Sequence, residues 1–173
     1  MRTAPGDNRL SAKRRRLTVP NDDAVAAWVH LAYSYHHMIR RLESELIEHD
    51  LTLAQFEVLA HLHYEPGIVQ TDLARRLLVS KGNVCGLIDR LAAARLVRRR
   101  VCQDDRRANR LLLTQRGTAL IAAAMPDHLS VIRSLLGRLP QADLRRLRCL
   151  LEHLEAITAG DGARPHGAAE TQP

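Results

Sequence analysis

The chain has 173 residues, enough for one domain with a substantial hydrophobic core. Its residues are 46% hydrophobic but only 3% aromatic, which favours packed helices over sheets. No stretch resembles a signal peptide or the roughly 20 uncharged residues of a membrane helix, so we expect a cytoplasmic protein without membrane contact. Three cysteines, in an odd count and without a C-x-x-C spacing, indicate neither a disulfide framework nor a structural zinc site.

Positive charge is concentrated in one part of the chain. The formal net charge is +7, yet residues 70–120 alone carry twelve lysines and arginines against four aspartates, a local charge of +8. The remainder is therefore close to neutral. A basic segment inside a balanced chain is typical of a surface that binds nucleic acid, although an ordinary solvated face can have the same composition.

The two ends of the chain have compositions that predict disorder. Residues 1–21 contain the basic run Lys13–Arg16 and too few apolar residues for a core, so we expect a disordered basic arm. Residues 159–173 are rich in glycine, alanine and proline and are expected to form a disordered tail.

The first structured segments are expected to be two helices. Apolar residues recur every three or four positions across residues 22–49, which predicts one long amphipathic helix capped by a residue at 21–23. Thr52 is expected to cap a shorter helix from Leu53 to His63.

Two short helices follow in close succession. Thr71 is expected to cap a helix from Asp72 to Leu78, and Ser80 to cap a second from Lys81 to Ala94. A tight connection and a polar outer face on the second helix are typical of a helix-turn-helix. The residues expected to face inward are Phe56, Leu59, Leu62, Leu73, Leu77, Leu78, Val84, Leu87, Ile88 and Leu91.

After Leu96 the pattern changes from helical to extended. Residues 97–102 and 110–113 are expected to form a β-hairpin with a charged loop, which is a wing. The fold class is therefore mainly α with a small β-wing: a winged helix-turn-helix domain at residues 51–114.

Two further helices complete the predicted chain. Thr114 is expected to cap a long helix that reaches Leu139 and is bent by Pro126, and Pro140 to start a last helix reaching Ile157. The long helices at residues 22–50 and 115–158 have more apolar surface than one small domain can cover. We expect them to be dimerisation helices that pack against a second copy.

Three stretches of this sequence resemble the MarR family of bacterial transcriptional regulators. They are L-T-L-A-Q-F-E-V-L-A-H-L at 51–62, T-D-L-A-R-R-L at 71–77 and D-D-R-R-A-N-R-L-L-L-T-Q-R-G at 104–117, and the resemblance covers roughly residues 25–157. It implies a homodimer that binds a palindromic double-stranded DNA operator, usually as a repressor. Many members release DNA when a small aromatic anion binds, which would make this chain ligand-responsive.

The helix at residues 81–94 is expected to read the DNA. Lysine, arginine and asparagine pair with bases or phosphates, glycine permits close backbone approach, and a serine cap leaves backbone N–H groups for a phosphate. An alternative for Arg90 is a pairing with Asp89 or Asp105. In the wing, the family pattern indicates Arg106 in the minor groove and Arg107 bracing the hairpin. The predicted DNA-binding residues are Ser80, Lys81, Asn83, Gly86, Arg90, Arg106 and Arg107.

Aromatic, imidazole and guanidinium groups on the first two helices suit a small phenolic or heteroaromatic carboxylate, which needs an apolar slot and cationic donors. The candidate effector-binding residues are Tyr33, His36, His37, Arg40, Phe56 and His61. A metal-responsive regulator, using His36 and His37 with His61 and His63, is the alternative, but satisfied or exposed histidines are favoured and no metal or other cofactor is expected.

Other functions receive less support from the sequence. No glycine-rich phosphate loop, nucleophile elbow or paired carboxylates indicate an enzyme. A winged-helix protein-interaction module without DNA binding is a further alternative, against which the clustered wing arginines argue. The family's redox mechanism uses a cysteine early in the first long helix, and this chain has none before Cys85, which is expected to be a small buried filler.

Overall fold

The computed structural model describes residues 22–101 and 109–161. By its internal contacts the chain divides into two units, one ending at His37 and the other beginning at Met38. Helix α1 spans Asp23–Leu46. The described part of the first unit is the N-terminal portion of this helix, up to His37. The expected arm, tail and wing loop lie outside the described residues, apart from residues 159–161 at the end of the last helix.

The second unit begins with the end of α1 and a sharp turn. A 3-10 helix, η1 at Ile47–His49, follows α1 and ends at Asp50, whose φ of 54° is left-handed. Helix α2 spans Leu53–Tyr64. Thr52 is its N-cap, as predicted, and forms a capping box with Gln55. Thr52 accepts from the Gln55 backbone N–H, and the Gln55 side chain accepts from the Thr52 backbone N–H.

Helices α3, Gln70–Arg76, and α4, Lys81–Ala93, form the helix-turn-helix. The Ser80 cap of α4 is confirmed, but the Thr71 cap of α3 is wrong because the helix begins two residues earlier than predicted, at Gln70, and its N-cap is Val69. The predicted packing of Leu78 is also wrong. Leu78 follows the end of α3 with a φ of 53° and is 93% exposed.

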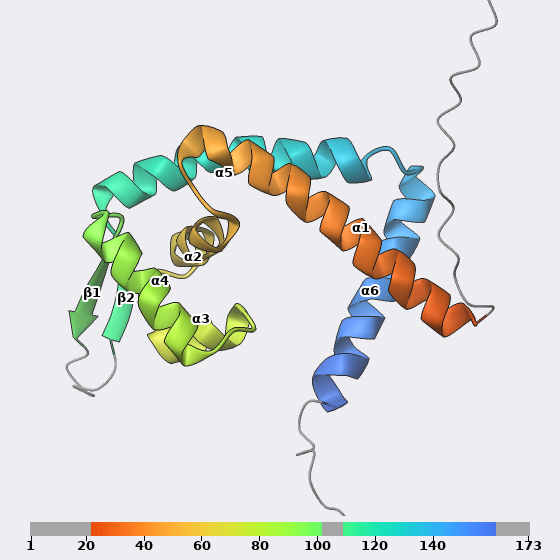
Figure 1. Ribbon diagram of the computed structural model, residues 1–173, viewed down its shortest axis with the longest axis horizontal. Coiled ribbons are helices and arrows are strands. Elements are labelled where there is room, and N and C mark those ends of the chain that lie inside the picture. Colours follow the sequence, from red (N-terminus) through yellow and green to blue (C-terminus); the bar gives the residue numbers. More distant parts are fainter. Residues whose placement is uncertain (1–21, 102–108, 162–173) are drawn as a thin grey trace, which may run out of the picture. The chain divides into compact units, whose positions relative to one another are not determined.

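The wing is a two-stranded antiparallel sheet of β1, Val97–Val101, and β2, Asn109–Leu113. Val97 pairs with Leu113, and Arg99 pairs with Leu111. The segment before α3 extends the sheet, because Leu111 exchanges backbone hydrogen bonds with Gly67 and Ile68. In Figure 1 the hairpin lies beside α4, which it contacts through β1.

Helix α5, Gln115–Leu136, leaves the wing, and α6, Gln141–Asp161, follows it. Among the described residues α5 is the one helix long and apolar enough to cross a membrane by length and composition. It also carries Arg116, Asp127 and Arg133, and one of its faces is buried against α2. The core helix of a soluble protein can meet the same criteria, so this helix is weak evidence for a membrane span.

The hydrophobic core lies in the second unit and joins α2, α3, α4, the wing and the first half of α5. Apolar residues at helical spacing supply it, as the sequence predicts for α2 and α4. Its fully buried large side chains are Leu46, Val58, Leu59, Leu62, Leu73, Val84, Ile88, Leu91, Leu111 and Ile121. The core fixes which face of α4 is left to solvent.

Candidate nucleic-acid interface

Helix α4 presents one side to the core and the other to solvent. Val84, Leu87, Ile88 and Leu91 are buried, so the opposite side is open along the whole helix. The N-cap Ser80 hydroxyl accepts from the Asn83 backbone N–H at 3.3 Å. The remaining N–H groups of the first turn point out of the helix end, where the helix dipole favours an anion.

The structure leaves the predicted DNA-reading side chains of α4 accessible. Lys81, Asn83 and Arg90 are exposed, and a Cβ built on Gly86 would have nothing within 4 Å. Within residues 22–101 and 109–161 no acid pairs with Arg90. Of the two partners considered for Arg90, Asp89 binds another arginine, and Asp105 lies outside the described residues.

An ion pair joins α4 to the wing. Arg99 in β1 donates from Nη2 to the Asp89 Oδ1 atom at 2.6 Å. Because successive side chains of a strand point to opposite faces, Arg98 and Arg100 lie on the face of the hairpin opposite to Arg99. All three arginines are exposed. Arg99 therefore braces α4, whereas Arg98 and Arg100 place their charges on the other face of the hairpin.

Arg106 and Arg107, the predicted minor-groove and bracing residues, lie outside the described residues. Their roles stay predictions that depend on the resemblance to the family.

The expectation that Cys85 is a buried filler is wrong. Its thiol is exposed on α4, where the Gln70 side-chain amide donates to it at 2.7 Å. Cys85 follows Val84 by one residue, and one residue turns a helix by about 100°, away from the buried side. A small apolar residue such as cysteine is often buried. The position of Cys85 on the helix nevertheless places its side chain in solvent.

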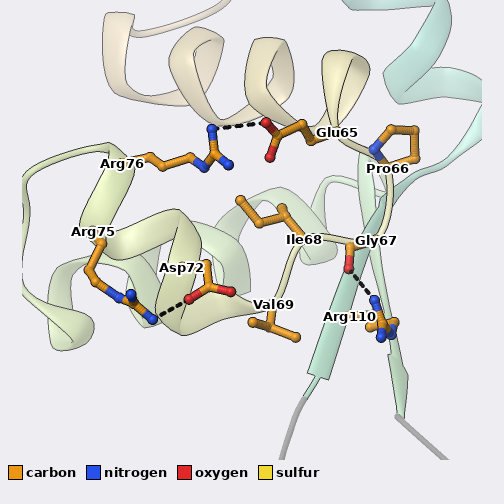
Figure 2. A pocket seen from close by; sticks show the side chains of 9 residues that line it. All are labelled: Glu65, Pro66, Gly67, Ile68, Val69, Asp72, Arg75, Arg76 and Arg110. Atoms are coloured by element: carbon orange, nitrogen blue, oxygen red, sulfur yellow. Dashed lines mark hydrogen bonds and ion pairs between the residues drawn. The ribbon is translucent and has the colours of Figure 1, made fainter.

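A cleft lies between the end of α2, the start of α3 and β2, and sequence reasoning had not indicated it (Figure 2). Arg75 bonds to Asp72, Arg76 Nη1 lies 2.9 Å from Glu65 Oε1, and Arg110 donates to a backbone carbonyl. The three guanidinium groups in the cleft therefore already have partners. This arrangement favours a structural role over the binding of an anion.

The candidate effector residues fall in both units. Tyr33, His36 and His37 belong to the first, where the Tyr33 and His37 rings lie 6.4 Å apart, as expected for residues four apart on a helix. Arg40 is exposed in the second unit. Their common site is therefore not described by this structure and stays a prediction.

The other two effector candidates, both on α2, have distinct surroundings. Phe56 is only 4% exposed and packs against the His128 ring, with 4.1 Å between ring centroids. His61 is half-buried and lies one turn after Glu57. Burial raises the pKa of Glu57, an effect that His61 opposes. Phe56 thus offers little surface to a ligand, and Glu57 places a carboxyl group close to His61.

A separate cluster of ionisable side chains joins α1, η1 and α5. His49 Nε2 lies 3.1 Å from Asp127 Oδ2 and 3.5 Å from Glu45 Oε1, and His128 Nδ1 lies 3.7 Å from Glu45 Oε2. Burial raises the pKa of Glu45, an effect that His49 opposes and Asp127 reinforces. Burial also lowers the pKa of His128. Sequence reasoning missed this cluster, because His49 and Asp127 are 78 residues apart.

Comparisons with known proteins identify the class that this fold defines. A family description, "MarR family", matches residues 49–108, which hold α2, the helix-turn-helix and β1. The transcriptional regulator HosA of Escherichia coli O157:H7 is 34% identical over 90 residues, which cover 52% of this chain and 67% of HosA. The chain belongs to the MarR family of winged-helix transcriptional regulators.

Solved structures agree with this assignment. AbsC, a MarR family transcriptional regulator from Streptomyces coelicolor, is 28% identical with a TM-score of 0.75 over 80% of this chain and 96% of its own. BpsR of Bordetella bronchiseptica, whose DNA binding is regulated by 6-hydroxynicotinic acid, is 25% identical with a TM-score of 0.69 over 75% and 98%. These likenesses extend beyond the winged domain to most of the chain.

Proposed function

We propose that this chain is a cytoplasmic, homodimeric transcriptional regulator that represses by binding a palindromic operator and is released by a small aromatic carboxylate. The single observation that carries the DNA-binding part is the exposed side of α4. The side chains of Lys81, Asn83 and Arg90 stand on it without partners among the described residues, and Ser80 caps its open N-terminus. Such groups donate to phosphates and pair with base edges in a major groove.

The charge around α4 supports the same proposal. The wing strand β1 carries Arg98 and Arg100 on one face, and the Arg99 bond to Asp89 holds β1 beside α4. A rigid connection between a groove-reading helix and a wing suits the simultaneous contact of two grooves. Two MarR-fold structures, MepR of Staphylococcus aureus and a MarR mutant of E. coli, were solved in complex with DNA.

Substitutions on α4 and the wing test the DNA-binding part. A duplex selected from a random-sequence library serves as the operator, and fluorescence anisotropy measures its affinity. Lys81→Ala and Arg106→Ala should each weaken operator binding by about 1 to 3 kcal/mol. Arg146→Ala, which removes an exposed charge from α6, is the matched control and should leave the affinity unchanged. Equal affinities of all three variants and the wild type would contradict the proposed interface.

The exposed apolar residues of the terminal helices support the homodimer. None of the α6 residues whose side chains are described is buried, and this helix presents Leu150, Leu151, Leu154 and Ile157. A row of exposed large apolar side chains marks a surface that another helix covers. Light scattering coupled to size exclusion should give twice the mass of one chain, and a monomer at micromolar concentration would contradict this part.

The aromatic effector is supported by the residue types on α1 and by the similarity to BpsR. Titration calorimetry with 6-hydroxynicotinic and salicylic acids should detect binding that Arg40→Gln weakens. Arg41→Gln, which removes the neighbouring exposed guanidinium, should not weaken it. Neither acid binding to the wild type would contradict the effector proposal while leaving the DNA-binding part intact.

A further inference from the structure

The cluster of Glu45, His49, Asp127 and His128 contains buried polar atoms that no protein group satisfies. Both carboxylate oxygens of Glu45 and the Nδ1 atom of His128 are inaccessible to solvent and have no hydrogen-bond partner within the described part of the chain. His128 as a whole is only 8% exposed. Buried polar groups in proteins nearly always have a partner, and an orphaned carboxyl group costs folding free energy.

The fold holds these groups in place by packing. The His128 ring lies against Phe56, with 4.1 Å between centroids and an angle of 30°, which directs Nδ1 toward Glu45. On the other side, the left-handed Asp50 closes η1 with a backbone bond to Ile47 and turns His49 toward α5. Packing thus holds the unsatisfied atoms of Glu45 and His128 close to each other, with His128 Nδ1 3.7 Å from Glu45 Oε2.

The distances match the coordination sphere of a metal ion. Ligand atoms that lie about 2.0–2.2 Å from a zinc ion are about 3–4 Å from one another. The three separations in the cluster are 3.1, 3.5 and 3.7 Å. The ligand atoms of Glu45, His49 and Asp127 all lie within 4.8 Å of one another, and His128 Nδ1 lies 3.7 Å from Glu45 Oε2 at the edge of this group.

We infer that Glu45, His49, Asp127 and His128 form a binding site for a divalent transition-metal ion of the zinc type. Two imidazoles and two carboxylates make a donor set that suits zinc and its first-row neighbours, whereas calcium and magnesium prefer oxygen ligands alone. The bound ion would supply the missing partner to Glu45 and His128. It would also tie η1 to α5, the helix that begins at the wing.

This inference goes beyond the proposed function and is independent of it. It needs neither DNA nor an aromatic ligand. It also differs from the alternative metal site in the sequence analysis, because His36, His37, His61 and His63 take no part in it.

Calorimetric titration of the metal-free full-length protein with Zn²⁺ tests the inference. We expect one Zn²⁺ per chain, and a Tm that rises by about 5 to 11 °C when free Zn²⁺ is about 100 times its Kd. Co²⁺ used as a spectroscopic probe should give visible absorption bands from a low-symmetry N and O site. Failure of the wild type to bind either ion would overturn the inference.

Variants locate the bound ion. His49→Gln and Asp127→Asn should each weaken Zn²⁺ binding at least about tenfold, the lower end of what the loss of even a supporting residue costs a metal site. Asp127 is mostly exposed, so Asp127→Asn should fold like the wild type and keep the test decisive. Glu48→Gln and His63→Gln, which alter exposed residues outside the cluster, are the matched controls and should bind normally. Wild-type affinity in both cluster variants, or weakened binding in the controls alone, would overturn the assignment.

Discussion

The Thr114 hydroxyl donates to the backbone carbonyl oxygen of Arg95 at 2.6 Å and accepts from the backbone N–H of Gly117 at 3.0 Å. One side chain thus caps α5 and fastens its start to the turn between α4 and the wing. Thr114→Val keeps the shape of the side chain but removes both bonds. We expect it to lower the free energy of unfolding by about 1 to 2 kcal/mol, measured by urea denaturation.

The matched control is Thr114→Ser, which retains the hydroxyl and should lose only a fraction of that stability. A Val variant as stable as the Ser variant would show that the cap does not hold α5 to the wing.

Two glycines with opposite surroundings provide a second prediction. A Cβ on Gly117 would lie 2.1 Å from the Leu96 carbonyl oxygen, which is backbone and cannot move aside cheaply, whereas one on Gly86 would meet open space. Gly117→Ala should therefore destabilise the protein by more than about 2 kcal/mol. Gly86→Ala should leave it unchanged or raise stability by up to about 1 kcal/mol, because alanine favours helix. Similar melting temperatures for the two variants would contradict this packing.

The Asp89 and Arg99 pair supplies a third prediction, on DNA binding. Asp89→Asn removes a negative charge from the exposed side of α4 and frees Arg99 for a phosphate. The plot of log affinity against log salt should become steeper by about one unit. Stability should change by less than about 1 kcal/mol, because the pair is accessible to solvent, with side chains 32% and 64% exposed. An unchanged slope would mean that Arg99 does not reach DNA even when released.

Much of the fold could be predicted from residue spacing. Thr52, Ser80 and Thr114 each precede an apolar helical pattern, and each caps a helix in the structure. Thr71 fails as a cap because Val69, which bridges to β2, already starts the helix. Leu78 fails as a core residue because a left-handed turn carries it out of the helical pattern.

The candidate site was only partly accessible from the sequence. Helical spacing predicts which α4 residues are exposed, because the buried positions of a single helix fix its outer side. The Arg99 bond to Asp89 and the cluster around Glu45 required the tertiary structure, since their members come from different elements. Local sequence patterns do not show which side chains from distant segments the folded core brings together.

The salt dependence of duplex binding tests the central claim most directly. The full-length protein is titrated against the selected palindromic duplex and a scrambled duplex between 50 and 200 mM salt, where phosphate contacts by a basic surface release counterions. We expect operator binding with a steep negative slope on a log-log plot, weaker binding to the scrambled duplex, and half-sites about 10 bp apart. Absence of binding to either duplex at the lowest salt would contradict the claim that this chain reads DNA.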